Sequence, residues 1–209
     1  MFKNRKEAGE LLAKALSKII DSSRGSEYIV VALPRGGVPV AKQIADSLGA
    51  KLDIFFVKKI PSPFNRETAI GAVSENGYFF VDSRAQKILG VDEEYIQNSI
   101  KEILNNIEKK RALYNKKRGS YKNKSVIVVD DGVATGSSMI LAVDALKKEG
   151  AKEVIVATPV APIEVANILK KVADEAIILE TPINFRAVGE FYFDFHQLSD
   201  DEVMSLLNS

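Results

Sequence analysis

Short apolar runs that alternate with helical patterns dominate this chain. Residues 28–33, 52–57 and 126–129 form three such runs, and each is followed by a polar turn. The run 126–129 consists only of β-branched residues, which is typical of a strand buried on both faces of a parallel sheet. The alternation predicts an α/β fold with a mostly parallel central sheet flanked by helices.

Capping patterns predict where helices begin. Asn4 and Glu7 have the spacing of a capping box, and so do Ser199 and Glu202. Apolar residues at helical spacing follow both pairs. Residues 92–117 carry apolar side chains on one helical face and charges elsewhere, so we expect a long amphipathic helix there.

The middle of the chain departs from the regular alternation. Two short apolar segments, 69–73 and 78–81, flank Asn76-Gly77. Asn-Gly tolerates the positive φ angles of a tight primed turn, so the pair is a strong hairpin signal. We therefore expect an antiparallel hairpin beside the parallel sheet.

Composition narrows the class of protein. The 209 residues are enough for one domain with a substantial core. With 29 basic and 28 acidic side chains, the net charge of +1 gives no overall field that would attract nucleic acid or an acidic membrane. The absence of cysteine excludes disulfides, thiolate metal sites and thiol nucleophiles. No signal segment or long apolar run is present in the sequence, so we expect a cytoplasmic protein.

The residues that follow the run 126–129 are candidates for a ligand-binding site. Asp130 and Asp131 follow this predicted strand directly, at the sheet edge where α/β proteins bind ligands. The next residues, 135–138, are small or hydroxyl-bearing and would begin a helix. The free N–H groups of a helix start suit a phosphate, whereas two carboxylates suit sugar hydroxyls. A phosphorylated ribose satisfies both requirements.

The segment 130–138, Asp-Asp-Gly-Val-Ala-Thr-Gly-Ser-Ser, resembles the phosphoribosyl pyrophosphate (PRPP) signature of the type I phosphoribosyltransferases. Residues 34–39, Pro-Arg-Gly-Gly-Val-Pro, resemble the pyrophosphate loop of the same enzymes. Together with 69–73 and the tail 185–197, these motifs look closer still to a group of predicted phosphoribosyltransferases of unknown acceptor. The resemblance covers nearly the whole chain.

The resemblance implies a division of labour around PRPP. Asp130 and Asp131 would hold the 2- and 3-hydroxyls of the ribose, and Asp131 would also reach Mg²⁺. The 5-phosphate would be held by a loop and helix start that comprise Ala134, Thr135, Gly136, Ser137 and Ser138.

The pyrophosphate would lie against the other motif. Arg35, Gly36 and Gly37 would wrap it, because glycines allow close backbone approach. Lys58 and Lys59, at the end of the predicted strand 52–57, would add positive charge. The family often has a strained non-proline cis peptide in this loop, for which Pro34–Arg35 is the candidate. A cis Leu33–Pro34 bond is intrinsically less costly and is the alternative.

Proton transfer needs a separate candidate. The 6-oxopurine enzymes of the family place an acid at the position of Ala134, so its absence counts against a hypoxanthine or guanine transferase. Glu67 is the best candidate acid or base. It lies in the irregular segment 61–68, which we expect to form a mobile lid. Lys59 is a second catalytic candidate.

The acceptor base would bind beneath a hood formed by the N-terminal helix and residues 183–209. Val133, Phe191 and Tyr192 are the candidate base contacts. The rings of Phe191 and Tyr192 could stack on a planar base. A single domain, residues 1–209, would include this hood. By resemblance, the protein would also be a homodimer.

The resemblance therefore implies a Mg²⁺-dependent enzyme of nucleotide salvage. It would transfer the 5-phosphoribosyl group from PRPP to a purine- or pyrimidine-type base and release pyrophosphate. A catalytically inactive PRPP-sensing regulator is the main alternative. An α/β phosphate-binding protein unrelated to PRPP is a third.

Overall fold

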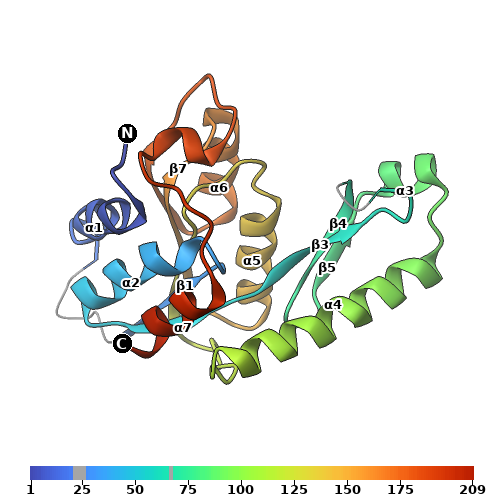
Figure 1. Cartoon of the computed structure of the whole chain (residues 1–209), viewed down its shortest axis with the longest axis horizontal. Helices are drawn as coiled ribbons and strands as arrows, with labels where there is room; N and C mark the ends of the chain where they lie inside the picture. Colours follow the sequence, from blue (N-terminus) through green and yellow to red (C-terminus); the bar gives the residue numbers. More distant parts are fainter. Residues whose placement is uncertain (21–26, 66–67) are drawn as a thin grey trace.

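The computed structural model describes residues 1–20, 27–65 and 68–209, and its centre is a five-stranded parallel sheet (Figure 1). Every neighbouring pair in this sheet is parallel, which confirms the predicted fold class. In spatial order, the strands are β2 (Lys51–Ile54), β1 (Tyr28–Ala32), β6 (Ser125–Val129), β7 (Glu153–Val160) and β8 (Glu175–Glu180).

Helices cover both faces of the parallel sheet. One cluster of buried side chains joins the sheet to α1 (Arg5–Leu16), α2 (Gly37–Leu48) and α7 (Asp200–Asn208). A second joins it to α5 (Ser137–Lys148) and α6 (Ile163–Val172). Strand β6 contributes to both clusters, because successive side chains of a strand point to opposite faces. Its apolar side chains are fully buried, as the all-β-branched run predicted.

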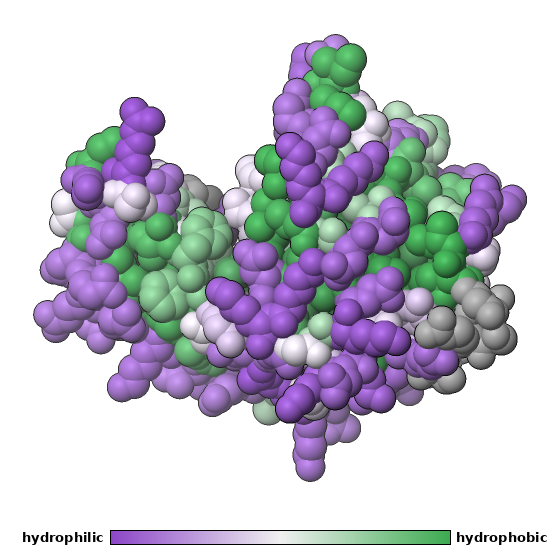
Figure 2. Space-filling view, turned by 180° about the vertical axis from the view of Figure 1, so that it is seen from behind, coloured by the Kyte–Doolittle hydropathy of each residue, from purple (hydrophilic) through white to green (hydrophobic). Residues whose placement is uncertain are grey.

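An arm projects from this core (Figure 1). It contains a separate antiparallel sheet of β3 (Val57–Pro61), β4 (Ala69–Ser74) and β5 (Phe79–Val81), together with α3 (Ser83–Leu89) and α4 (Glu93–Leu113). The predicted hairpin is confirmed, since β4 and β5 pair on either side of Gly77, whose φ is 84°. Seen from behind, a notch separates arm from core, and hydrophilic residues cover most of this face (Figure 2).

The predicted strand 52–57 is in fact two strands in two sheets. Phe55 still bonds the parallel sheet, where its N–H donates to Ala32 O at 2.9 Å. At Phe56 the chain turns to Glu75 instead: Phe56 N–H donates to Glu75 Oε2 at 3.0 Å, and Glu75 N–H donates to Phe56 O at 2.9 Å. Strand β3 therefore begins at Val57.

A buried ion-pair network fixes the root of the arm. The Arg111 guanidinium of α4 donates to both carboxylate oxygens of Glu75, at 2.7 and 3.0 Å. The same guanidinium lies 3.6 Å from Asp53 of β2. Burial raises the pKa of Glu75, although Arg111 opposes the shift. Arm and core are thus joined by a buried ion-pair network of Glu75, Arg111 and Asp53.

The helix ends follow local chemistry. Helix α7 has the predicted capping box, with Ser199 and Glu202 bonding each other's backbone. Helix α1 has only half of one, because the Glu7 side chain accepts from Lys3 N–H. Helix α4 ends at Leu113, earlier than predicted, since Asn115 adopts a left-handed φ of 51°. In the described parts of the chain, no helix is long and apolar enough to cross a lipid bilayer.

Candidate active site

The loops that follow β1 and β6 meet at the carboxyl edge of the parallel sheet. Gly37 lies so close to β6 that an added Cβ would be 2.5 Å from Val129 O. An added Cβ on Gly36 would lie 2.2 Å from Asp131 Oδ2. The peptide bond between Pro34 and Arg35 is cis, as predicted. The two predicted PRPP motifs are therefore in direct contact.

Asp131 is the centre of a buried bonding network. Its Oδ2 accepts from Arg5 Nε of α1 at 2.7 Å, and Arg5 Nη1 also donates to His196 O at 2.9 Å. The Tyr192 hydroxyl donates to Asp131 O at 2.6 Å. Arg5 therefore links the N-terminal helix, the signature acid and the C-terminal segment, a role that the sequence analysis missed.

The two adjacent acids share an environment that disfavours two negative charges. Asp131 N–H donates to Asp130 Oδ1 at 2.9 Å. Burial raises the pKa of Asp130 well above its usual range, and the Asp131 carboxylate raises it further. Burial also raises the pKa of Asp131, although Arg5 opposes this shift. Such carboxylates are stabilised by any ligand that donates hydrogen bonds or brings positive charge.

The segment after Asp131 forms an open loop and then a helix. Gly136 adopts a φ of 81°, and α5 begins at the next residue. Ala134 and Thr135 are exposed, and the Thr135 and Ser137 hydroxyl oxygens lie 3.4 Å apart. Because the N-cap residue is glycine, no capping side chain takes the first N–H groups of α5. These groups can serve an anion.

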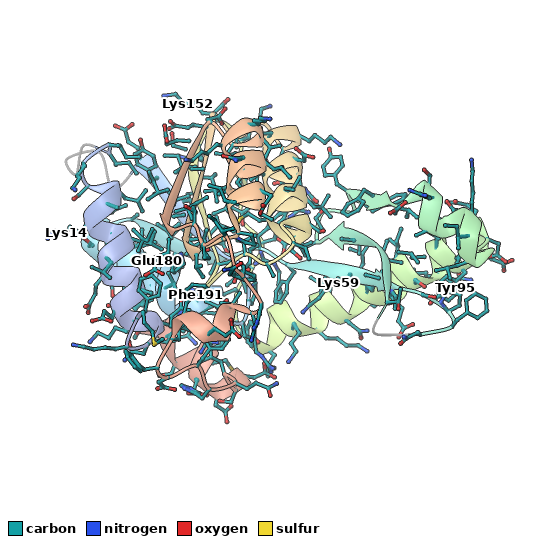
Figure 3. The ribbon with its side chains drawn as sticks, turned by 90° about the horizontal axis from the view of Figure 1, so that it is seen from above. Lys14, Lys59, Tyr95, Lys152, Glu180 and Phe191 are labelled. Atoms are coloured by element: carbon teal, nitrogen blue, oxygen red, sulfur yellow. The ribbon has the colours of Figure 1, made fainter. Side chains whose placement is uncertain are left out.

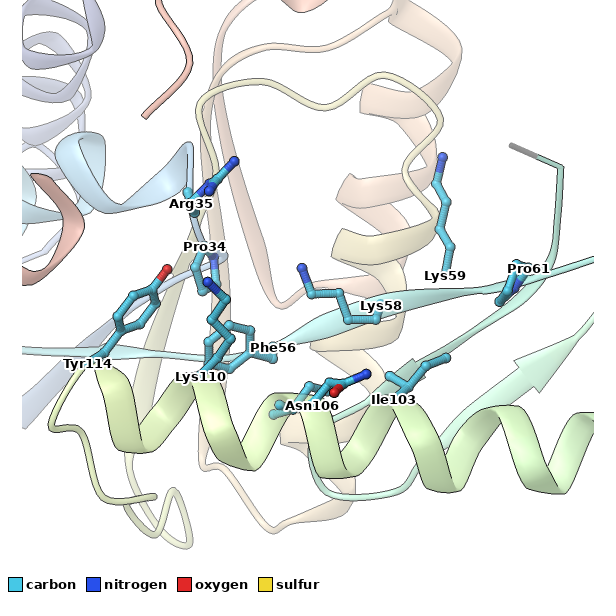
Figure 4. Close-up of a pocket in the computed structure, with 11 residues that line it drawn as sticks. Pro34, Arg35, Phe56, Lys58, Lys59, Pro61, Ile103, Asn106, Lys110 and Tyr114 are labelled. Carbon is cyan, nitrogen blue, oxygen red and sulfur yellow. The ribbon is translucent and has the colours of Figure 1, made fainter. Parts of the chain in front are cut away.

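Positive charge gathers on the other side of the pyrophosphate loop. A cavity of about 560 Å³ lies between this loop, β3 and α4, and its cationic side chains are Arg35, Lys58, Lys59 and Lys110 (Figure 4). Lys59 lies where the arm meets the core (Figure 3). Burial lowers the pKa of Lys58, as do the charges of Arg35 and Lys110. The structure thus places Lys58 and Lys59 beside the loop, although inside a strand rather than at its end.

Asp200 of α7 faces these cations. Its carboxylate lies 3.7 Å from Arg35 Nη1 and accepts hydrogen bonds from Lys110 Nζ and from the Tyr114 hydroxyl. Lys110 and Tyr114 lower the pKa of Asp200. The sequence analysis missed Lys110 and Asp200, because each looks like an ordinary exposed helix residue.

The predicted base contacts are less accessible than the PRPP motifs. Tyr192 is 5% exposed and packs against Phe2 and Phe195, and Val133 is 5% exposed. Their side chains therefore offer little surface to a base in this conformation. Phe191 is half-buried and stacks on Phe185, with ring centroids 5.6 Å apart.

A smaller cavity, about 360 Å³, adjoins Asp131 beneath the C-terminal segment. Its other lining residues are Arg5, Arg35, Gly36, Phe195, His196, Gln197 and Leu198. Glu67, the predicted acid or base, lies outside the described residues. The predicted lid, residues 61–68, is closed at its base by a hydrogen bond in which Ser62 N–H donates to Thr68 O at 2.7 Å.

Comparison with known proteins decides the family of this chain. A model of the phosphoribosyl transferase domain matches residues 1–195. The chain belongs to the phosphoribosyltransferases. The resemblance noted in the sequence is thereby confirmed.

Individual relatives agree with this membership. "Putative phosphoribosyl transferase Rv0571c" of Mycobacterium tuberculosis is 33% identical over 210 residues, which cover 100% of this chain and 46% of that protein. This phosphoribosyltransferase chain thus spans about half the length of the curated relatives it matches. The crystal structure of TT1426 from Thermus thermophilus is 37% identical with a TM-score of 0.81, over 99% of this chain and 97% of that one. AQ2163 from Aquifex aeolicus shares the fold, at 14% identity and a TM-score of 0.50, over 84% and 73% of the two chains.

Proposed function

We propose that this protein transfers the 5-phosphoribosyl group of PRPP to a nitrogenous base and releases pyrophosphate. The observation that carries the proposal is the contact between the two motifs, in which Gly36 lies against the Asp131 carboxylate. This contact brings an acid proposed for the ribose hydroxyls beside the loop proposed for the pyrophosphate. The open start of α5, proposed for the 5-phosphate, follows Asp131 in the chain.

The chemistry requires little covalent help from the protein. The bond between C1 of the ribose and the pyrophosphate oxygen breaks, and pyrophosphate leaves with the electron pair. A ring nitrogen of the base then bonds C1 from the opposite face and loses its proton. Arg35, Lys58 and Lys59 stabilise the charge that grows on the leaving group, while Asp130 and Asp131 fix the sugar.

The donor set suits Mg²⁺. Within residues 1–20, 27–65 and 68–209, no cluster of three or more His, Cys, Asp or Glu side chains could hold a metal. Mg²⁺ usually binds through one or two carboxylates together with water and substrate phosphates, and Asp130 and Asp131 supply two carboxylates. Bound there with PRPP, the ion would neutralise charge on the pyrophosphate. Asp131 would be the residue that reaches the ion.

The acceptor would bind on the side of Asp131 that faces α1 and residues 183–209, which serve as the hood of a single domain. Val133, Phe191 and Tyr192 would adjoin the base once the hood adjusts. Glu67 would transfer the proton, with the segment 61–68 as a lid. We further propose a homodimer that acts in nucleotide salvage in the cytoplasm.

The deciding experiment measures pyrophosphate release from PRPP and Mg²⁺ with a panel of purines, pyrimidines and related heterocycles. Release that depends on one base would support the transferase and identify its acceptor. PRPP binding without release for any base would assign a sensing regulator instead, and binding of simple phosphosugars in preference to PRPP would exclude both.

Two variants separate binding from chemistry. The double variant Asp130→Asn with Asp131→Asn should lose PRPP affinity, while Glu67→Gln should keep affinity and slow turnover. Undiminished PRPP binding by the double variant would overturn the site assignment.

A further inference from the structure

The cavity between β3, α4 and the pyrophosphate loop has a lining that pyrophosphate alone does not explain. Its floor is made of apolar side chains contributed by Pro34, Phe56, Pro61, Ile103, Ile107 and Tyr114. Pyrophosphate is wholly polar and would leave this floor without a partner. Its volume, about 560 Å³, is in the range of sites for small organic ligands.

The cationic groups of the cavity lie on one side of this floor. Figure 4 shows the ammonium groups of Lys58 and Lys110 pointing to the same side as the Arg35 guanidinium. Burial lowers the pKa of Lys58, and the charges of Arg35 and Lys110 lower it further. Asp200 is the carboxylate that pairs with Arg35 and Lys110. Arg35, Lys58 and Lys110 against this one carboxylate leave two positive charges, and Lys59 adds a third at the other end of the lining, so the cavity suits an anion such as a phosphate monoester.

The part of the floor that a ligand can reach is a small apolar surface. Phe56 and Tyr114 are 2% and 1% exposed and stack on each other with ring centroids 6.2 Å apart, so they pack beneath this surface. Pro34, Pro61 and Ile103 are half-buried and line the cavity. The Asn106 amide of α4 faces the cavity and can both donate and accept hydrogen bonds at the edge of a heterocycle.

We propose that this cavity is a second ligand site, which binds a nucleoside monophosphate with its phosphate at Arg35, Lys58 and Lys110 and its base against Pro61 and Ile103. Because Arg35 and Lys58 belong to both sites, the nucleotide competes with PRPP. This competition rests on the proposed function, whereas the nucleotide site itself does not.

Three single substitutions locate the nucleotide, with AMP as the probe and calorimetry as the readout. Asn106→Glu adds a carboxylate inside the cavity and should weaken AMP binding at least tenfold. Asn105→Glu makes the same charge change one residue away, outside the cavity lining, and should leave AMP affinity within about twofold. Thr135→Glu, on the exposed phosphate loop, should also leave it unchanged.

Two further ligands test the assigned chemistry. Adenosine lacks the phosphate and ribose 5-phosphate lacks the base, so each should bind at least tenfold more weakly than AMP. AMP affinity that falls in Thr135→Glu and survives in Asn106→Glu would place AMP in the PRPP site and overturn the proposal, as would no AMP binding at all.

PRPP binding by the same variants keeps the two proposals apart. Suppose that the wild type binds AMP, that Asn106→Glu weakens this binding, and that the wild type does not bind PRPP. The proposed function then fails and the nucleotide site stands. If PRPP binds and is lost in Thr135→Glu while AMP does not bind, only the nucleotide site fails.

Discussion

Gly36 and Asp131 are in van der Waals contact across the two signature loops, with no room for a side-chain carbon between them. A Cβ on Gly36 would lie 2.2 Å from Oδ2, 2.5 Å from Cγ and 2.7 Å from Oδ1 of Asp131. The φ of Gly36 is −56°, which any residue adopts. Glycine is therefore required here for space rather than for backbone freedom.

Gly36→Ala should displace the Asp131 carboxylate or the loop. We expect a loss of stability of about 1–3 kcal/mol, typical of overpacking, together with at least tenfold weaker PRPP binding. Gly49→Ala is the control: the φ of Gly49 is 63° and the space around it is open, so this change should cost about 1 kcal/mol and spare PRPP affinity. Calorimetry and urea denaturation measure both effects. Equal PRPP affinity in Gly36→Ala and wild type would contradict the assignment.

Asp130→Asn should stabilise the free protein at neutral pH. The pKa of Asp130 is raised in the folded state, so its contribution to stability is present below the ordinary value of 3.8 and is lost as pH rises through the raised value. The side-chain amide of asparagine does not ionise, so the variant does not lose stability as the pH rises. We expect a gain of about 1 kcal/mol at pH 7 that disappears near pH 4, with PRPP affinity lost. Urea denaturation at both pH values tests this, and a gain independent of pH would be inconsistent with it.

Arg5→Met should destabilise the folded protein, because it leaves the buried Asp131 carboxylate without its partner. The side chains of Arg5 and Asp131 are 9% and 12% exposed, so removal of the guanidinium leaves a carboxylate without its partner. We expect a loss of about 3 kcal/mol at pH 7. Lys14→Met, on the exposed face of the same helix, should change stability by less than about 0.5 kcal/mol. Far-ultraviolet circular dichroism in urea suits this measurement because the chain has no tryptophan.

The Glu75–Arg111 pair should show strong coupling in a double-mutant cycle. The Glu75 side chain is 2% exposed and that of Arg111 is 9% exposed. Arg111→Met or Glu75→Leu alone should each cost about 3–5 kcal/mol, since each removes the hydrogen-bonded partner of a buried charge. The ion-pair partners that remain are more distant, with Asp53 at 3.6 Å from Arg111 and Arg118 at 3.8 Å from Glu75. The double variant should cost less than either single variant. Additive losses, measured by chemical denaturation, would show that the ion pair does not fix the arm.

Much of the fold was predictable because its signals are local. The all-β-branched run of β6, the Asn76-Gly77 turn and the capping box of Ser199 and Glu202 depend on residues close together in sequence. The contact between the loops after β1 and β6 was also predictable, because the carboxyl ends of parallel strands share one edge of a sheet.

The missed features depend on contacts between distant segments. Arg5 and Asp131 are 126 residues apart, and Lys110 and Asp200 are 90 apart. In the sequence Arg5, Lys110 and Asp200 are each one charge among many on a helix, so only Asp131 of these four residues stood out. The division of residues 52–57 between two sheets was missed for the same reason. The chain leaves the parallel sheet where Phe56 bonds Glu75, a residue 19 positions away in the sequence.

The hairpin of the arm is fastened at its root to a helix that also carries the phosphate loop. Asn76 Nδ2 donates to Glu149 Oε1 at 2.8 Å, and Glu149 caps the C-terminus of α5. This helix of 12 residues is about 18 Å long, and its other end follows Gly136. The same helix therefore holds the turn of the hairpin at one end and the loop that follows Asp131 at the other, a connection of about 18 Å between the arm and that loop.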